Sequence, residues 1–172
     1  EISCSLVGSE MCIRDRDMVV LDLDGNIIEG HLNPSSDTPT HLELYKHWRH
    51  EIKAIIHTHS INAVAWAQAM KPIPCFGTTH ADCFYGSVPV TRVLSADEIN
   101  KHYELSTGHV ILETFQTIEP TAVPGVLVAN HGPFCWGKNL TKALEAAITL
   151  EAISEMALKT LIVNPNNPNT PN

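Results

Sequence analysis

The sequence predicts an α/β protein in which helices cover a mixed β-sheet. Short apolar runs rich in β-branched residues alternate along the chain with longer amphipathic stretches, which is the pattern of strands and helices in layered folds. Proline, glycine and helix-capping residues separate the two kinds of segment. The chain has 172 residues, 44% of them hydrophobic, which is enough for one domain with a single substantial core.

The N-terminal region is expected to contain a leader and a β-hairpin. Glu1–Arg16 has no clear helical or strand period, and we interpret it as a leader that is not native to the domain. The domain then begins at about Asp17, and Met18–Leu23 is predicted to be a buried strand. A turn at Asp24–Asn26 returns the chain as a second strand over Ile27–Glu29.

The rest of the chain alternates predicted helices and strands. Capping residues and prolines in Pro34–Pro39 open a helix that runs to about Trp48. Ser95 and Glu98 form a capping box that opens another helix, which we expect to end near Thr107. In chain order, the other predicted elements are a strand over 52–58, a helix over 60–70, a loop with a short helical piece over 75–84, strands over 88–90, 110–115 and 126–130, and a long helix over 139–163 before a disordered tail over 164–172.

Composition argues against several classes of protein. The net charge is −8 without a basic cluster, so we expect neither nucleic acid nor an anionic membrane as a partner, because both need Lys and Arg to meet phosphates. No apolar run approaches the roughly 20 residues that span a bilayer, and no secretory signal begins the sequence, so a cytoplasmic location is expected. The five cysteines are irregularly spaced and include no CxxC pair, which favours reduced thiols.

Three histidines are the first candidates for metal ligands. His57 and His59 lie two residues apart, so in an extended chain their side chains point to one face, roughly 6–7 Å apart along the backbone. Alone, this pattern is more typical of hydrogen-bonded neighbours. His131 favours a metal site, because it also ends an apolar strand, and strand ends are where α/β folds place their catalytic and binding residues. Three neutral imidazoles leave an open coordination position, as in catalytic zinc sites.

A polar segment at a predicted helix start is a candidate phosphate site. Ser35, Ser36 and Asp37 precede the helix, where unpaired backbone N–H groups and the positive end of the dipole can bind phosphate oxygens. An ordinary N-cap is the simpler interpretation of these residues. Asp37 can instead turn inward and supply a fourth ligand, an oxygen, to the metal.

A second polar segment, Gly77–Gly86, lies between apolar elements and has glycine at both ends. Such loops often carry catalytic residues. Within it, Asp82 is a candidate general acid/base and Thr78 a candidate hydrogen-bond partner of a substrate. By composition alone, the segment is more typical of a surface loop.

Four segments together resemble the L-ribulose-5-phosphate 4-epimerases of the class II aldolase/epimerase family. They follow one another in the order seen in that family: Ser35–His41, Ile56–Ser60, Gly77–Gly86 and Val128–Asn139. The resemblance extends from about Asp17 to Val163. It implies a three-layer α/β/α fold with a mixed, mainly antiparallel central sheet.

The resemblance also implies roles and a reaction. His57, His59 and His131 would be zinc ligands with Asp37 beside the metal, and Asp82 would be the acid/base residue. Ser35 and Ser36 would hold the phosphate of the sugar phosphate substrate. The implied reaction interconverts L-ribulose 5-phosphate and D-xylulose 5-phosphate. Because the C4 hydrogen is not acidic, cleavage and re-formation of the C3–C4 bond is the easier route, with zinc as the Lewis acid.

The family carries further residues on both sides of this segment. They include a Lys-Pro-Ser-Gly loop that completes the phosphate site and a tyrosine, donated by a neighbouring subunit, as the second acid/base. We therefore expect the domain to be truncated at both ends, and the full-length assembly to be a homotetramer with its sites between subunits. The pathway served, arabinose or ascorbate breakdown, stays open.

Two other functions also stay open. The first is a class II aldolase acting on L-fuculose or L-rhamnulose 1-phosphate, although such enzymes typically carry Glu at the position of Asp37. The second is a non-catalytic adducin-like domain, a class that lacks the three histidines. Zinc content and the accumulation of dihydroxyacetone phosphate are the measurements that separate these functions from the epimerase.

Overall fold

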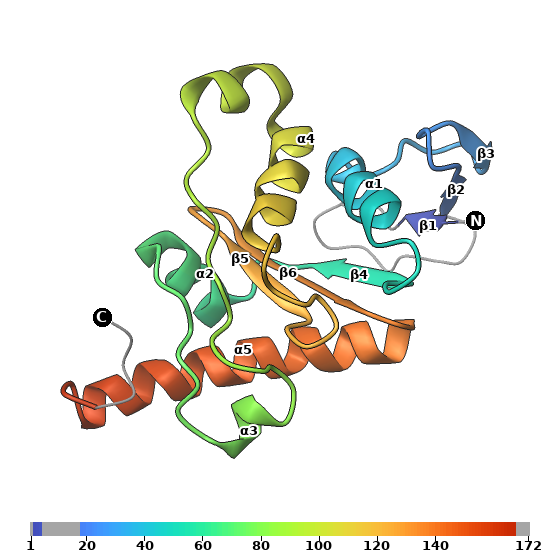
Figure 1. Cartoon of the computed structure of the whole chain (residues 1–172). Coiled ribbons are helices and arrows are strands. Elements are labelled where there is room, and N and C mark those ends of the chain that lie inside the picture. The colour runs from blue at the N-terminus through green and yellow to red at the C-terminus, as the bar shows by residue number, and fades with distance from the viewer. Residues whose placement is uncertain (1, 5–17, 168–172) are drawn as a thin grey trace.

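Five helices and six strands make up the described part of the chain, which in this computed structural model comprises residues 2–4 and 18–167 (Figure 1). In order they are β1 (Ile2–Cys4), β2 (Val19–Leu21), β3 (Ile27–Glu29), α1 (Thr38–His47), β4 (Ala54–His57), α2 (Ile61–Ala69), α3 (Thr78–Ala81), α4 (Ala96–Thr114), β5 (Gly125–Val128), β6 (Gly132–Gly137) and α5 (Leu140–Val163). The predicted alternation of strands and helices is therefore confirmed.

The central sheet has the strand order β4-β6-β5, and both pairings are antiparallel. His57 of β4 lies opposite Phe134, and Val128 of β5 lies opposite Gly132. An isolated parallel bridge between Val90 and Leu127 adds a neighbour to β5. The sheet is thus mixed and mainly antiparallel, as expected, although the predicted strand over 88–90 is reduced to single bridges.

Helices cover both faces of the central sheet. Trp136 of β6 packs against Trp48 and Phe115, which directly follow α1 and α4, with ring centroids 4.9 and 5.0 Å apart. The neighbouring residue Cys135 points the other way, since adjacent side chains on a strand alternate between faces. A Cβ atom at Gly125 would lie 3.0 Å from Leu150 Cδ1 and 3.2 Å from Cys135 Sγ, so α5 lies close against that second face. Figure 1 shows α5 running beneath the sheet with α1 and α4 above it.

The N-terminal strands form a separate small sheet in the order β1-β2-β3. The predicted hairpin is confirmed, and the Asp22 carboxylate stabilises its turn by accepting hydrogen bonds from the backbone N–H groups of Asp24 and Asn26 and from the Asn26 amide. Gly25 in this turn has φ +86°, a conformation that side chains rarely allow. β1 pairs with β2, while residue 1 and residues 5–16 of the expected leader lie outside the described residues.

The prediction of a strand over 110–115 is wrong, because α4 continues to Thr114. Val110 and Ile111 are fully buried, and a short buried apolar run does not by itself distinguish a strand from a helix. Gly108 does not end the helix as predicted. A Cβ atom there would lie 3.0 Å from Glu43 Cβ, so glycine instead allows α1 to pack closely on α4. The break in α4 falls at His102, which has φ −150° and ψ 58°.

No strand is predicted from the sequence between 131 and 138, yet β6 begins at Gly132 and is the central strand of its sheet. Pro133 has no N–H group and is unusual in such a strand. Here the opposite residue, Leu127, donates its N–H group to Pro89 rather than to β6. The carbonyl of Pro133 faces the end of β4, where it accepts a hydrogen bond from the backbone N–H of Thr58. The missing N–H group therefore leaves the ladder with β5 intact.

The bounds of the remaining elements agree with those predicted from the sequence to within a few residues. Strand 52–58 is β4, helix 60–70 is α2, and the short helical piece in 75–84 is α3. After α5, a backbone hydrogen bond from Asn167 to Asn164 closes a turn, and residues 168–172 of the expected disordered tail lie outside the described residues. Among the helices described, none has the length and apolar character needed to cross a membrane.

Removing the Trp136 side chain should destabilise the core. Trp136 is 1% exposed, lies between Trp48 and Phe115, and donates its indole N–H to the Pro120 carbonyl. We expect Trp136→Ala to lower the free energy of unfolding by about 3–5 kcal/mol, measured by urea denaturation. Ile28→Ala is the control, since Ile28 is 60% exposed and its loss should change the free energy by less than about 0.5 kcal/mol. Equal effects of the two substitutions would contradict this packing.

Candidate metal centre

The three predicted histidines converge at one edge of the central sheet. His57 ends β4, His59 follows two residues later, and His131 lies between β5 and β6. One nitrogen from each ring can be chosen so that all three lie within 4.8 Å of one another. The Nε2 atoms of His57 and His59 are 3.1 Å apart, and each pair of rings has its centroids 4.7–5.0 Å apart. This geometry brings together residues separated by more than seventy positions in the chain.

A tight turn and a glycine bring His131 to this position. The N–H of His131 donates to the carbonyl oxygen of Val128 at 3.0 Å, and Asn130 adopts φ 63°, a conformation that asparagine tolerates in turns. A Cβ atom at Gly132 would lie only 2.9 Å from the carbonyl oxygen of Thr58. The hairpin can therefore approach the end of β4 closely only with glycine at this position.

The His57 ring is held from two sides. Its Nδ1 atom lies 2.9 Å from the Pro133 carbonyl oxygen, and the ring stacks on Phe134 at a centroid distance of 4.1 Å. A carbonyl oxygen only accepts, so Nδ1 carries the proton and Nε2 keeps its lone pair. That lone pair faces the cluster. Histidine ligands of metals are commonly oriented by a hydrogen bond of this kind at the other ring nitrogen.

The Asp37 carboxylate faces the same cluster. Asp37 occupies the N-cap position of α1, but its side chain makes no capping hydrogen bond. One carboxylate oxygen instead lies 3.8 Å from His57 Nε2. The hydroxyl of Ser35 accepts from the Asp37 backbone N–H, at 3.2 Å, in the turn before the helix. Of the two interpretations of Asp37 open at the sequence level, this geometry favours the inward-facing carboxylate.

The donor set fits a divalent metal ion. Four ligands around zinc at about 2.0–2.1 Å place neighbouring nitrogens roughly 3.3 Å apart, close to the observed separation of His57 and His59. Burial lowers the pKa of His57. Burial, together with repulsion from His57 when that ring is protonated, lowers the pKa of His131 to about 4. Both imidazoles are therefore neutral near pH 7, which leaves a lone pair on each for a metal. Three imidazoles and one carboxylate are ligands that zinc accepts.

Two aromatic side chains beside the cluster were not identified as functional from the sequence. Tyr103 of α4 places its hydroxyl 3.2 Å from His131 Nδ1. His41 of α1 lies edge-on to Phe134, and burial lowers its pKa to about 4 against the opposing effect of Asp37. Tyr103 adjoins no recognisable ligand motif in the sequence. The only local signal was the position of His41 at the end of the segment that begins at Ser35.

The other candidate residues lie at two different places. Ser35 and Ser36 precede α1 and lie directly before Asp37 in the sequence. The Ser36 side chain is exposed. Thr78 and Asp82 flank α3 and are both exposed. Helix α3 packs on α5, and Figure 1 shows it on the opposite side of α5 from β4 and α1. Within one chain, the described contacts do not bring Thr78 or Asp82 to the histidine cluster.

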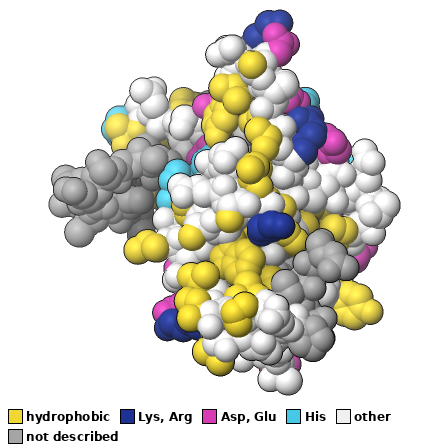
Figure 2. All heavy atoms as spheres, turned by 90° about the vertical axis from the view of Figure 1, so that its left-hand side faces the viewer, with side chains coloured by type: hydrophobic (Ala, Val, Ile, Leu, Met, Phe, Trp, Pro, Cys, Tyr) yellow, Lys and Arg dark blue, Asp and Glu magenta, His cyan; other side chains and the backbone are white. Residues whose placement is uncertain are grey.

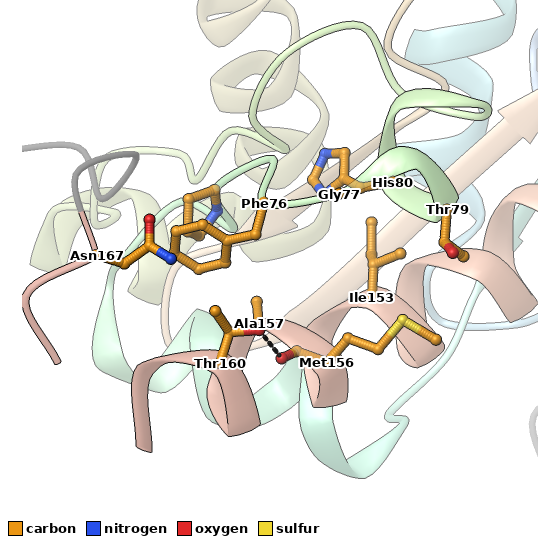
Figure 3. Close-up of a pocket in the computed structure, with 10 residues that line it drawn as sticks. Phe76, Gly77, Thr79, His80, Ile153, Met156, Ala157, Thr160 and Asn167 are labelled. Atoms are coloured by element: carbon orange, nitrogen blue, oxygen red, sulfur yellow. Dashed lines mark hydrogen bonds between the residues drawn. The ribbon is translucent and has the colours of Figure 1, made fainter. Parts of the chain in front are cut away.

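A cavity of about 330 Å³ lies between the loop that leads into α3 and the C-terminal half of α5 (Figure 3). Its lining includes Phe76, His80, Ile153 and Met156. His80 is buried and its Nε2 atom lies 2.7 Å from the Gly86 carbonyl oxygen, so this histidine closes the loop that carries Asp82. None of the cavity's lining residues belongs to the histidine cluster, so the cavity is separate from it.

The chain belongs to the Class II Aldolase and Adducin N-terminal domain family, which matches residues 9–158. The resemblance inferred from the ordered motifs is thereby confirmed.

More particularly, the chain is similar to curated L-ribulose-5-phosphate 4-epimerases. It is 49% identical over 149 residues to the enzyme named UlaF from Salmonella typhi, an alignment that covers 87% of this chain and 65% of that protein. The same values hold for UlaF from Salmonella paratyphi A. The chain thus spans just under two thirds of the length of these relatives.

Two solved structures of aldolases share the fold. An L-fuculose 1-phosphate aldolase has a TM-score of 0.71 and 26% identity, with 88% of this chain and 66% of the aldolase covered. L-fuculose-1-phosphate aldolase from Thermus thermophilus has a TM-score of 0.67 and 20% identity, with 90% and 74% covered. The second similarity bears on the fold alone. Together they confirm the class II aldolase-like α/β architecture.

The low pKa of His41 predicts a loss of stability in acid. The folded-state pKa is about 4, whereas an unfolded histidine titrates near 6.5. Between these values the unfolded chain binds a proton that folded His41 does not, so the free energy of unfolding falls as pH drops from 6.5 to 4. The expected loss is at most about 3 kcal/mol.

Urea denaturation at about pH 7 and about pH 4.5, with EDTA present, measures this dependence across the window in which His41 titrates. His41→Gln should reduce the pH-dependent loss relative to the parent chain, because glutamine does not titrate. An equal loss in both proteins would assign the acid sensitivity to other groups.

Proposed function

We propose that this chain is the metal-binding part of a zinc-dependent L-ribulose-5-phosphate 4-epimerase, which interconverts L-ribulose 5-phosphate and D-xylulose 5-phosphate. The convergence of His57, His59 and His131, with the Asp37 carboxylate on the same side, carries this proposal. The 49% identity to proteins named L-ribulose-5-phosphate 4-epimerase supports the choice of reaction within the family.

The proposed reaction breaks and re-forms the C3–C4 bond of the sugar. A general base takes the proton from the C4 hydroxyl, C4 becomes an aldehyde carbon, and the electron pair of the C3–C4 bond moves into an enediolate over C2 and C3. Rotation of the aldehyde and re-addition to its other face inverts C4, and a general acid returns the proton to the C4 oxygen. Zinc, when bound, would supply Lewis-acid stabilisation of the negative charge on the sugar oxygens.

The start of α1 is the proposed phosphate site. The positive end of the helix dipole favours an anion there. Ser35 and Ser36 lie beside that turn in the sequence. Thr78, which begins α3, is proposed as a further contact to the substrate in a neighbouring subunit's site. Because Asp37 joins this segment to the histidine cluster, a ketose phosphate bound here would have its phosphate and its reacting carbons held by neighbouring residues.

Asp82 is proposed as an acid/base residue that acts in a neighbouring subunit's site. Asp82 is exposed beside α3, which packs on the side of α5 away from the histidines. An assembly of identical chains, which we propose to be the family's homotetramer, would bring this carboxylate to another copy's metal centre.

The surface of the chain is compatible with such an assembly. Apolar side chains gather on the lower part of the face in Figure 2. Among the apolar residues of α5, Met156 and Ile162 are at least 50% exposed, as is Met70, which follows α2. Apolar patches of this kind commonly mark contacts with other chains.

An aldolase is the second candidate, favoured by the 26% identity to an L-fuculose 1-phosphate aldolase. Asp37, where such aldolases typically carry Glu, argues for the epimerase. Incubation with each sugar phosphate distinguishes the two functions. Accumulation of dihydroxyacetone phosphate from L-fuculose 1-phosphate, without epimerisation of L-ribulose 5-phosphate, would establish the aldolase instead.

Zinc analysis tests the metal centre. We expect about one zinc per chain in the purified protein, and a loss of at least about tenfold in affinity in His57→Ala, because one of the nitrogen ligands is removed. His109→Ala is the control, since His109 is exposed and lies beside Glu43 rather than in the cluster. An absence of zinc from the parent protein, even after addition of zinc salts, would contradict the proposed centre and favour a non-catalytic, adducin-like domain.

Asp82→Asn tests the acid/base assignment. Loss of a general acid/base typically lowers kcat by about 10²–10⁴-fold, and zinc content should stay unchanged because Asp82 is not a proposed ligand. Epimerisation in D₂O provides a second measurement. The bond-cleavage route leaves the C4 hydrogen in place, so the product should carry no deuterium at C4. Incorporation of deuterium there would refute this route.

A further inference from the structure

Tyr103 approaches the metal-binding cluster from the helical layer above the sheet. It directly follows the break in α4 at His102, so it begins the second helical segment of that helix. Its hydroxyl lies 3.2 Å from His131 Nδ1, and the two rings are 5.8 Å apart between centroids. The phenol is therefore the hydrogen-bonding neighbour of the one cluster histidine that lies in the β5–β6 connection.

The backbone around Tyr103 is held firmly in place. Its carbonyl accepts a hydrogen bond from Thr107 Oγ1 at 2.9 Å, and the carbonyl of the next residue, Glu104, accepts from Thr40 Oγ1 at 2.6 Å. Thr40 is fully buried and belongs to α1, the helix that begins beside Asp37. The phenol and the Asp37 carboxylate are therefore positioned by the same pair of packed helices.

The hydrogen bond to Nδ1 determines which nitrogen of His131 is free. A neutral imidazole has one N–H group and one lone pair. If the Tyr103 oxygen accepts from Nδ1–H, then Nε2 keeps the lone pair and can face the cluster. His57 has the same arrangement, with Nδ1 at 2.9 Å from the Pro133 carbonyl and Nε2 toward His59. A backbone carbonyl orients the strand histidine, and a side-chain oxygen is available for the histidine in the turn.

We propose that Tyr103 is a positioning residue whose phenol oxygen accepts the Nδ1–H of His131 and holds Nε2 of that histidine toward the shared metal. This inference rests on the proposed function, because it assumes that the three histidines bind one metal ion. Tyr103 itself touches neither the metal nor the substrate in this role. It acts through the orientation and the tautomer of His131.

The affinity for zinc tests this role without reference to activity. Competition with a chromophoric chelator measures the dissociation constants of the parent chain, Tyr103→Phe and Tyr85→Phe. Loss of an outer hydrogen-bond partner typically weakens metal binding by about 10–100-fold, which is the expected result for Tyr103→Phe. Tyr85→Phe also loses one phenol oxygen, but the Tyr85 side chain is 84% exposed, so zinc affinity should not change.

The outcomes distinguish the proposed role of Tyr103 from the proposed metal centre itself. Zinc binding by the parent chain with unchanged affinity in Tyr103→Phe would overturn the role of Tyr103 and leave the metal centre standing. No zinc binding by the parent chain would overturn both. Urea denaturation with EDTA present shows whether Tyr103→Phe remains folded before its affinity is interpreted.

Nitrogen NMR of the zinc-loaded parent chain is a second test that needs no substitution at Tyr103. With ¹⁵N-labelled histidine, the ring signals of His131 are identified by their loss in His131→Gln. We expect the chemical shifts of a metal-bound Nε2 and a protonated Nδ1, with the Nδ1 proton protected from exchange. A metal-bound Nδ1 in His131 would overturn the proposal, because Tyr103 would then compete with the metal for that nitrogen.

Discussion

The backbone at Gly132 lies against the carbonyl oxygen of Thr58, where a Cβ atom would come within 2.9 Å of that oxygen. This contact joins the end of β4 to the beginning of β6. It determines the distance between the histidines at the end of β4 and the one that precedes β6, because backbone contacts in a packed sheet leave little freedom to shift. The proposed metal centre therefore depends on a position that contributes no side chain.

Around this contact, neighbouring groups orient the candidate metal ligands. The carbonyl of Pro133 fixes the tautomer of His57, and Phe134 supports the ring from one face. Pro133 and Phe134 belong to the same strand, so β6 holds the ring through both its backbone and a side chain. Burial keeps the imidazoles of His57 and His131 neutral by lowering the pKa of each. The Asp37 carboxylate adds a negative charge where a cation would be bound.

The candidate ligands could be predicted from the sequence because each carries a local signal. The two-residue spacing of His57 and His59 on a strand, and the apolar run before His131, are visible in the sequence. Tyr103 carried no such signal, since a tyrosine in an amphipathic helix is usually part of a core. The β-branched residues of 110–115 predict a strand, but a helix can bury the same apolar residues, as α4 does.

Residue type and local spacing are enough to predict the α/β class, the ordered motifs of the family and the candidate metal ligands, because each of these is a property of a short segment. The folded structure was needed to show that Pro133 lies in a central strand, that α4 breaks at His102 and that Tyr103 contacts His131. It also decided that Asp82 lies apart from the histidines of its own chain. These features depend on contacts between distant segments, whose free energies outweigh local preferences.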